Sequence, residues 1–325
     1  MLYPSSTPIE QLQAITAYLK SNNNYSKRSV QDIRAAALES SRQLPLLEGV
    51  NVEPVEAETF SGEWVRADGE SLQCTGHPQP ADNKVILYFH GGGFVSDSSE
   101  IYRDLAARLS EAAGGITVLT VEYRLAPEFC YPAANEDCLA AYHWLLERGV
   151  HAGNIILCGD SIGATLALMT LITLREQGDR LPAAACLLSP HADLVHLDGE
   201  SYDSCAGTDP TGSREANQKI ILEYMGDFGG AWPAILSPLR MDLRGLPPLL
   251  IQAGNHEVLL SDAERLAEQG RAAGITVELQ VWENMWCAFQ LMAAMLPEAQ
   301  QAIGNIGSFI KRIAYQSTES EQQTQ

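Results

Sequence analysis

"NIILCGDSIGATLALMTL", residues 154 to 171, runs from a short apolar segment, typical of a buried strand, into a longer one typical of a helix. The two are joined by Gly-Asp-Ser-Ile-Gly, a G-x-S-x-G sequence in the strand, turn and helix context of a nucleophile elbow. Ser161 is therefore the candidate nucleophile, and so tight a turn leaves no room for side chains at Gly159 and Gly163. The alternative is a structural turn without chemistry.

The same alternation of short apolar runs and helical stretches continues on both sides of this segment. Two helices are marked by their end signals, one with Pro132 near its start and one running from Ser261 to Gly274. Strand and helix in alternation predict an α/β fold with a mainly parallel sheet covered on both faces. The expected buried strands lie at 85–93, 116–125, 154–161, 184–190, 247–255 and 275–283.

Two regions fall outside this alternation. Capping residues near Thr7 and Ser29 predict two helices within residues 1–50. Residues 196–236 interrupt the main domain, 51–315, with Gly, Asp and Ser clusters and one helical stretch near 214–225. We expect both regions to form a small helical cap. The polar tail, residues 316–325, is predicted to be disordered.

Composition excludes several classes of protein. The 325 residues, 46% of them apolar, suit one large domain, and a net charge of −20 disfavours nucleic acid as a partner. Seven scattered cysteines without a CxxC pair indicate neither disulfides nor a metal site. The absence of a leader pattern and of an apolar run near ~18 residues predicts a cytoplasmic protein without a membrane partner.

A second glycine-rich motif, "HGGGF" at residues 90 to 94, follows another expected strand. Its glycines would let the N–H groups of Gly91 and Gly92 bind a substrate oxyanion together with the N–H of Ile162. His90 and Asp160 are assigned to the same substrate site, with His90 as a support for the loop rather than a base. The alternative is a flexible loop.

A candidate acid follows a later strand. Glu257 lies in "HEVLLSD", residues 256 to 262, directly after the apolar run 247–255. Ligands bind at the carboxyl ends of strands in open α/β sheets, and an acid that follows the nucleophile has the expected chain order. A solvated loop residue is the alternative.

Together these motifs resemble the hormone-sensitive-lipase-like family of α/β-hydrolases, the bacterial family IV esterases. The resemblance rests on "HGGGF", "VEYRLAPE" (121–128), "GDSIGA", "SPHADL" (189–194), "LPPLLIQAGNHEVLLSDAERLAE" and "VELQVWENM". It implies an eight-stranded sheet with a helical cap, Ser161 as nucleophile, Glu257 as acid, and oxyanion donors at Gly91, Gly92 and Ile162. It also implies hydrolysis of a small-molecule carboxylic ester without a cofactor, and it is compatible with a homodimer.

The sequence departs from that family at the base. In "VWENMWCAFQ", residues 281 to 290, the family's histidine position falls on Cys287. An imidazole with a pKa near 6.5 accepts the serine proton, whereas a thiol with a pKa near 8.5 is a poor base until it ionises. His191 is the best substitute among the seven histidines, because it follows the strand expected between those of Ser161 and Glu257. His256, next to Glu257 in sequence, is expected to face away.

Three hypotheses therefore remain open. The chain is an esterase that is weak or uses an unusual base. Alternatively, it is a repurposed enzyme, such as a cyclase, lyase or acyl transferase, that uses the oxyanion site on a developing enolate or alkoxide. Finally, the pocket belongs to a binding protein without catalysis.

Overall fold

The computed structural model describes residues 1–22, 26–41, 47, 49–67, 84–96 and 99–322. Its centre is a single mostly parallel sheet in the order β1-β9-β8-β7-β6-β4-β5-β3-β2, in which β3 alone runs opposite to the other strands, antiparallel to β2 and β5. The strands are β1 (Leu2–Tyr3), β2 (Asn51–Glu56), β3 (Ser61–Arg66), β4 (Val85–Phe89), β5 (Thr117–Glu122), β6 (Ile155–Asp160), β7 (Ala184–Leu188), β8 (Leu249–Gly254) and β9 (Val277–Trp282).

The α/β-hydrolase fold predicted from the sequence is confirmed, with one strand more than the eight expected. The additional strand is β1, which pairs in parallel with β9 through Leu2 opposite Val281 and Tyr3 opposite Trp282. Two residues are too few for an alternating pattern, so sequence periodicity does not reveal such a strand.

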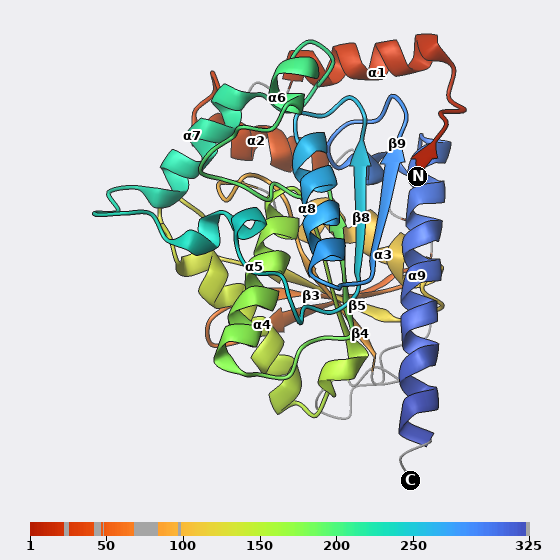
Figure 1. Ribbon diagram of the computed structural model, residues 1–325. Coiled ribbons are helices and arrows are strands. Elements are labelled where there is room, and N and C mark those ends of the chain that lie inside the picture. Colours follow the sequence, from red (N-terminus) through yellow and green to blue (C-terminus); the bar gives the residue numbers. More distant parts are fainter. Residues whose placement is uncertain (23–25, 42–46, 48, 68–83, 97–98, 323–325) are drawn as a thin grey trace.

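Helices cover both faces of the sheet, as Figure 1 shows. Side chains of β4 alternate between the two faces: Leu87 and Phe89 pack into one apolar cluster and Ile86 and Tyr88 into the other. The first cluster includes side chains of α4 (Ala133–Glu147), α5 (Ile162–Gln177) and α8 (Leu260–Ala272), and the second those of α3 (Ser99–Ala112) and α9 (Pro297–Gln322). Because both faces are buried, the central strands β4 and β7 are apolar throughout.

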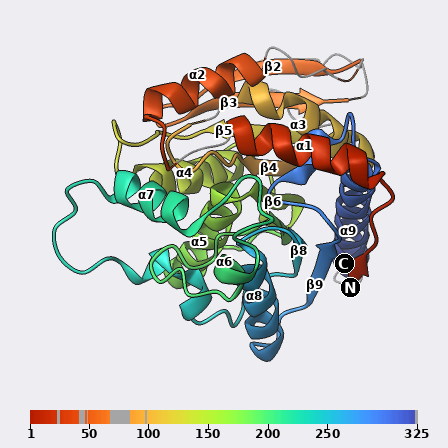
Figure 2. The same cartoon turned by 90° about the horizontal axis from the view of Figure 1, so that it is seen from above.

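A third group of helices lies beyond the carboxyl ends of β8 and β9 (Figure 1), and Figure 2 shows them over the sheet from above. The group comprises α1 (Ile9–Asn22), α2 (Val30–Ser41), α6 (Ser201–Ser204) and α7 (Arg214–Met225). The two N-terminal helices and the helix at 214–225 are confirmed. The start of α2 has the expected cap, since the Asp32 N–H donates to Ser29 Oγ at 3.1 Å.

None of the helices in the described part is long and apolar enough to cross a bilayer. Short 3₁₀ helices complete the described elements. These short helices are η1 (Ala152–Asn154), η2 (Ala234–Leu236), η3 (Pro238–Arg240) and η4 (Phe289–Met292).

The predicted disorder of residues 316–325 is wrong for 316–322, because α9 continues to Gln322. Glutamate and glutamine are good helix formers, so a helix begun at Pro297 extends readily into this polar sequence. Residues 323–325 lie outside the described residues.

The buried carboxylate of Glu298 anchors the segment before α1. Glu298 Oε1 accepts hydrogen bonds from the N–H groups of Ser6 and Thr7 at 2.5 and 2.7 Å, and Oε2 accepts one from Thr7 Oγ1 at 2.6 Å. Burial alone would raise the pKa of Glu298, but these hydrogen bonds outweigh it and lower the pKa to about 2. The ionised carboxylate therefore stabilises the folded state.

Glu298→Gln is expected to lower the free energy of unfolding at pH 7 by about 1.5–3 kcal/mol, the usual range for hydrogen bonds to a charged group. A carboxyl whose folded pKa is depressed contributes above its unfolded pKa of ~4.3 and loses that contribution as the pH falls toward 2. The difference between parent and variant in urea unfolding should therefore shrink between pH 7 and pH 3.5. Glu10→Gln, at an exposed position of α1, is the control. A constant difference at both pH values would contradict this role.

Candidate active site

Ser161 lies at a sharp turn between β6 and α5. Its backbone has φ 51° and ψ −119°, an unfavourable conformation for a residue with a side chain. A Cβ on Gly159 would overlap the backbone of Gly163, and a Cβ on Gly163 would overlap the carbonyl oxygen of Phe89. The turn therefore requires both glycines, as the sequence predicts, and it presents Ser161 at the N-terminus of a sixteen-residue helix.

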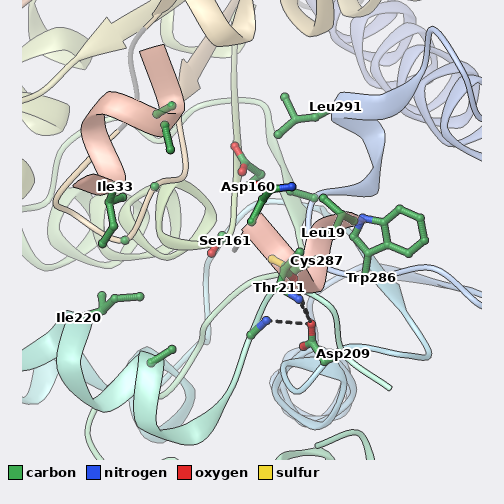
Figure 3. A pocket seen from close by; sticks show the side chains of 18 of the residues that line it. Leu19, Ile33, Asp160, Ser161, Asp209, Thr211, Ile220, Trp286, Cys287 and Leu291 are labelled. Atoms are coloured by element: carbon green, nitrogen blue, oxygen red, sulfur yellow. Dashed lines mark hydrogen bonds between the residues drawn. The ribbon is translucent and has the colours of Figure 1, made fainter. Parts of the chain in front are cut away.

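Ser161 lines a half-open cavity of about 410 Å³ between the sheet and the cap helices. Figure 3 shows Ser161 and Cys287 near its centre, with apolar side chains around them. The apolar lining comes from α1, α2, α7 and the segment leading to η4: Leu19, Ile33, Ile220, Trp286 and Leu291. A cavity of this size and polarity suits a small organic ligand.

Three backbone N–H groups beside Ser161 donate no hydrogen bond to any described residue: those of Gly92, Gly93 and Ile162. Gly92 and Gly93 line the cavity with φ values of 91° and 68°, which favour glycine. Ile162 is the first residue of α5, where the helix dipole favours negative charge. Such an arrangement can serve as an oxyanion site.

The expectation that the Gly91 N–H binds the substrate oxyanion is corrected by the structure. Its N–H donates to Tyr102 OH at 3.0 Å and to Asp160 Oδ1 at 3.1 Å, so it is not available to a substrate. Gly93, which the sequence reasoning passed over, lines the cavity instead. The third glycine of "HGGG" was the available signal, but the partner of Gly91 depends on tertiary contacts.

Asp160 and His90 hold the glycine loop. Besides Gly91, the buried Asp160 carboxylate accepts hydrogen bonds from Tyr88 OH at 2.8 Å and Tyr102 OH at 3.1 Å. His90 is buried, stacks on Tyr123 with ring centroids 4.2 Å apart, and has Nδ1 2.9 Å from the Gly91 carbonyl oxygen. Asp160 also lines the cavity, whereas His90 is not among its lining residues. The supporting tyrosines were not singled out from the sequence.

Cys287 lies in the cavity against Ser161. Burial raises the pKa of its thiol well above the ordinary value, and nearby carboxylates, first Glu257, raise it further. The hydrogen bond with the Ser161 hydroxyl lowers the pKa of Cys287, but this effect is smaller than the effects that raise it. The sulfur is therefore protonated near neutral pH and is not a useful proton acceptor.

Glu257 is fully buried behind the cavity wall. Its Oε2 accepts hydrogen bonds from Ser189 Oγ at 2.9 Å and from the Gly254 N–H at 3.0 Å, while Oε1 has no partner among the described residues. Burial raises the pKa of Glu257 to about 8, and the two hydrogen bonds only partly oppose this shift. Leaving a buried carboxyl oxygen without a hydrogen bond costs free energy, and Glu257 Oε1 is such an oxygen.

The hypothesis of a substitute base at His191 is wrong. The ring is buried, its Nε2 lies 2.9 Å from Tyr202 OH, and no hydrogen bond joins it to Ser161 among the described residues. Burial also lowers the pKa of His191 to about 4. Within the described chain the cavity lining contains no histidine, His256 included, and His77 lies outside the described residues. No group of three or more potential metal ligands occurs in the described ranges.

Comparison with known proteins agrees with this architecture. Residues 86–291 match the family described as alpha/beta hydrolase fold. The chain is 38% identical over 251 residues to an acetyl-hydrolase of Streptomyces hygroscopicus, covering 77% of this chain and 79% of that protein. It is 34% identical over 268 residues to an esterase of Acinetobacter venetianus, covering 82% and 84%.

Among solved structures, it is similar to the crystal structure of an esterase from the bacterial hormone-sensitive lipase family. The TM-score is 0.84 at 35% identity, with 94% of this chain and 99% of the other covered. The chain therefore belongs to the α/β-hydrolase fold family, and within it to the hormone-sensitive-lipase-like group.

Proposed function

We propose that this protein is a serine-dependent carboxylic-ester hydrolase with an impaired triad of Ser161, Glu257 and Cys287 in the place of histidine. One observation carries the proposal: Ser161 lines a cavity of about 410 Å³ beside the N–H groups of Gly92 and Ile162, which donate to none of the described residues. The related acetyl-hydrolase and esterase support a small-molecule ester as substrate.

The chemistry that follows from these groups is acyl transfer to Ser161. The hydroxyl oxygen attacks the ester carbonyl, and the backbone N–H groups stabilise the negative charge that develops on the carbonyl oxygen. The alcohol then leaves, and water releases the acyl group. Each half of the reaction needs a proton acceptor and donor, and the Cys287 thiol with its raised pKa serves poorly. We therefore infer slow turnover through Ser161, far below that of a complete triad, because loss of the histidine of a serine triad costs about 10⁶ in kcat.

A binding protein without turnover is the second candidate. It is favoured by the protonated state of Cys287 and by the lack of a histidine among the described lining residues. The two candidates differ in whether Ser161 becomes acylated.

The parent protein is expected to hydrolyse p-nitrophenyl acetate slowly, and Ser161→Ala to reduce the rate to that of buffer, because the nucleophile is removed. A fluorophosphonate probe should label the parent at Ser161, slowly, and should not label the variant. Ser110→Ala, at a buried serine of α3 outside the cavity lining, is the control. Equal rates for parent and Ser161→Ala, without labelling, would favour the binding protein.

A further inference from the structure

A chain of three buried side chains leads away from the cavity. Asn217 on α7 lines the cavity, and its Nδ2 lies 2.9 Å from the hydroxyl of Tyr202 on α6. That hydroxyl lies 2.9 Å from Nε2 of His191. The three residues are 7%, 2% and 1% exposed, so the chain is shielded from solvent. Neither Asn217 nor Tyr202 has a role in the proposed acyl transfer.

The direction of these hydrogen bonds follows from the charge states. Because burial lowers the pKa of His191 to about 4, its imidazole is neutral at pH 7 and Nε2 can accept. Burial raises the pKa of Tyr202, so its hydroxyl keeps its proton. An imidazole nitrogen is a stronger base than an amide oxygen, so Tyr202 donates to His191 and accepts from Asn217 Nδ2. The Asn217 amide is thereby fixed in one orientation.

In that orientation the amide oxygen is left over. Asn217 Oδ1 accepts no hydrogen bond from the described residues. It is not one of the inaccessible polar atoms without a partner, so it retains some accessible surface. Since Asn217 lines the cavity, Oδ1 is reachable from it. Asp209, which also lines the cavity, has its Oδ1 already hydrogen-bonded. This oxygen accepts from the Thr211 N–H at 2.7 Å and from Thr211 Oγ1 at 3.0 Å. Figure 3 shows this pair at the cavity wall.

We propose that Asn217 selects esters whose acyl or alcohol part carries a hydroxyl or N–H group, an assignment that rests on the proposed ester hydrolysis. Such a group donates a hydrogen bond to Asn217 Oδ1. A plain alkyl ester displaces water from this oxygen without replacing the hydrogen bond that the water made. A site built to pair a polar group discriminates against the analogue that lacks it. For one neutral hydrogen bond we expect about a tenfold difference in affinity.

The test measures binding in the Ser161→Ala protein, where no ester is consumed. Phenyl 3-hydroxybutyrate and phenyl butyrate, which share their carbon skeleton, are titrated by calorimetry. We expect the hydroxylated ester to bind with a Kd about tenfold lower. Adding Asn217→Leu should raise the Kd of the hydroxylated ester to that of phenyl butyrate. Tyr202→Phe, which keeps the ring and removes the hydroxyl that orients Asn217, should reduce the ratio as well.

Asn22→Leu is the matched control, since Asn22 also lines the cavity but is half-exposed, so solvent competes for its amide. This variant should keep the tenfold ratio. Equal Kd values in the Ser161→Ala protein, a ratio unchanged by Asn217→Leu, or no binding of the hydroxylated ester would each overturn the proposal. Failure of the proposed hydrolysis would appear separately, as equal turnover by the parent and Ser161→Ala, and would leave the Kd ratio standing.

Discussion

Cys287→His is expected to raise kcat/KM for p-nitrophenyl acetate by up to about 10⁶-fold, the loss that follows when the histidine of a serine triad is removed. Cys287 lies against Ser161 and packs against the cluster that includes Val258 and Leu259, the two residues after Glu257. In the described part of the chain Glu257 Oε1 has no hydrogen-bond partner, so it can accept the Nδ1–H of an imidazole. Such a ring would leave Nε2 to take the Ser161 proton, with a pKa near 6.5 suited to neutral pH.

The gain is measured as steady-state hydrolysis, with circular dichroism and thermal unfolding to verify the fold. Cys130→His tests whether a new histidine elsewhere has any effect, since Cys130 is partly exposed and outside the cavity lining. Cys287→Ser tests whether removal of the thiol suffices. Neither control should rise more than about twofold, because neither supplies a base beside Ser161. A folded Cys287→His protein with the parent rate would show that Cys287 does not occupy the position of the base.

The position of Ser161 was predictable because local sequence determines it. A short apolar run, two glycines around the serine and an apolar helix leave one geometry for the turn, and the structure has it. The helix at Arg214–Met225 was predictable for the same reason, since its cap at Ser213 is local. The departure from the family at Cys287 was visible in the sequence because no histidine occurs at that place.

Tertiary contacts decided the rest. Gly91 was expected to bind substrate, but its N–H is taken by Asp160 and Tyr102, which come from distant parts of the chain. His191 was expected to be a substitute base, but its Nε2 lies 2.9 Å from the hydroxyl of Tyr202 on α6. No periodicity in the sequence reports such partners.

The edges of the sheet were missed for a related reason. Strands β2 and β3 were not singled out from the sequence, because β2 is mostly half-exposed and carries a proline at position 54. Strand β1 has only two residues and owes its structure to β9. Where an element depends on its neighbour more than on its own pattern, the sequence of that element alone does not predict it.

Glu257→Gln is expected to lower kcat by about 10³- to 10⁴-fold in the Cys287→His protein and by less than about twofold in the parent. In the first background the carboxylate would accept the Nδ1–H of the new imidazole and stabilise the imidazolium that forms during attack. A glutamine amide there would instead donate to Nδ1, which shifts the ring proton to Nε2 and prevents it from accepting the Ser161 proton. In the parent, the thiol of Cys287 makes no use of the carboxyl, so the same change has little to remove.

A stability measurement separates this effect from damage to the fold. The pKa of Glu257 in the parent is raised to about 8, so the folded state holds a proton that the unfolded chain, with a pKa of ~4.3, has released. Stability from this group therefore falls as the pH rises between these values. Glu257→Gln removes that dependence, and its unfolding free energy relative to the parent should increase from pH 5 to pH 8. A loss of activity in the Cys287→His background together with this gain in relative stability would assign Glu257 to orienting the base, whereas equal losses of activity in both backgrounds would contradict that role.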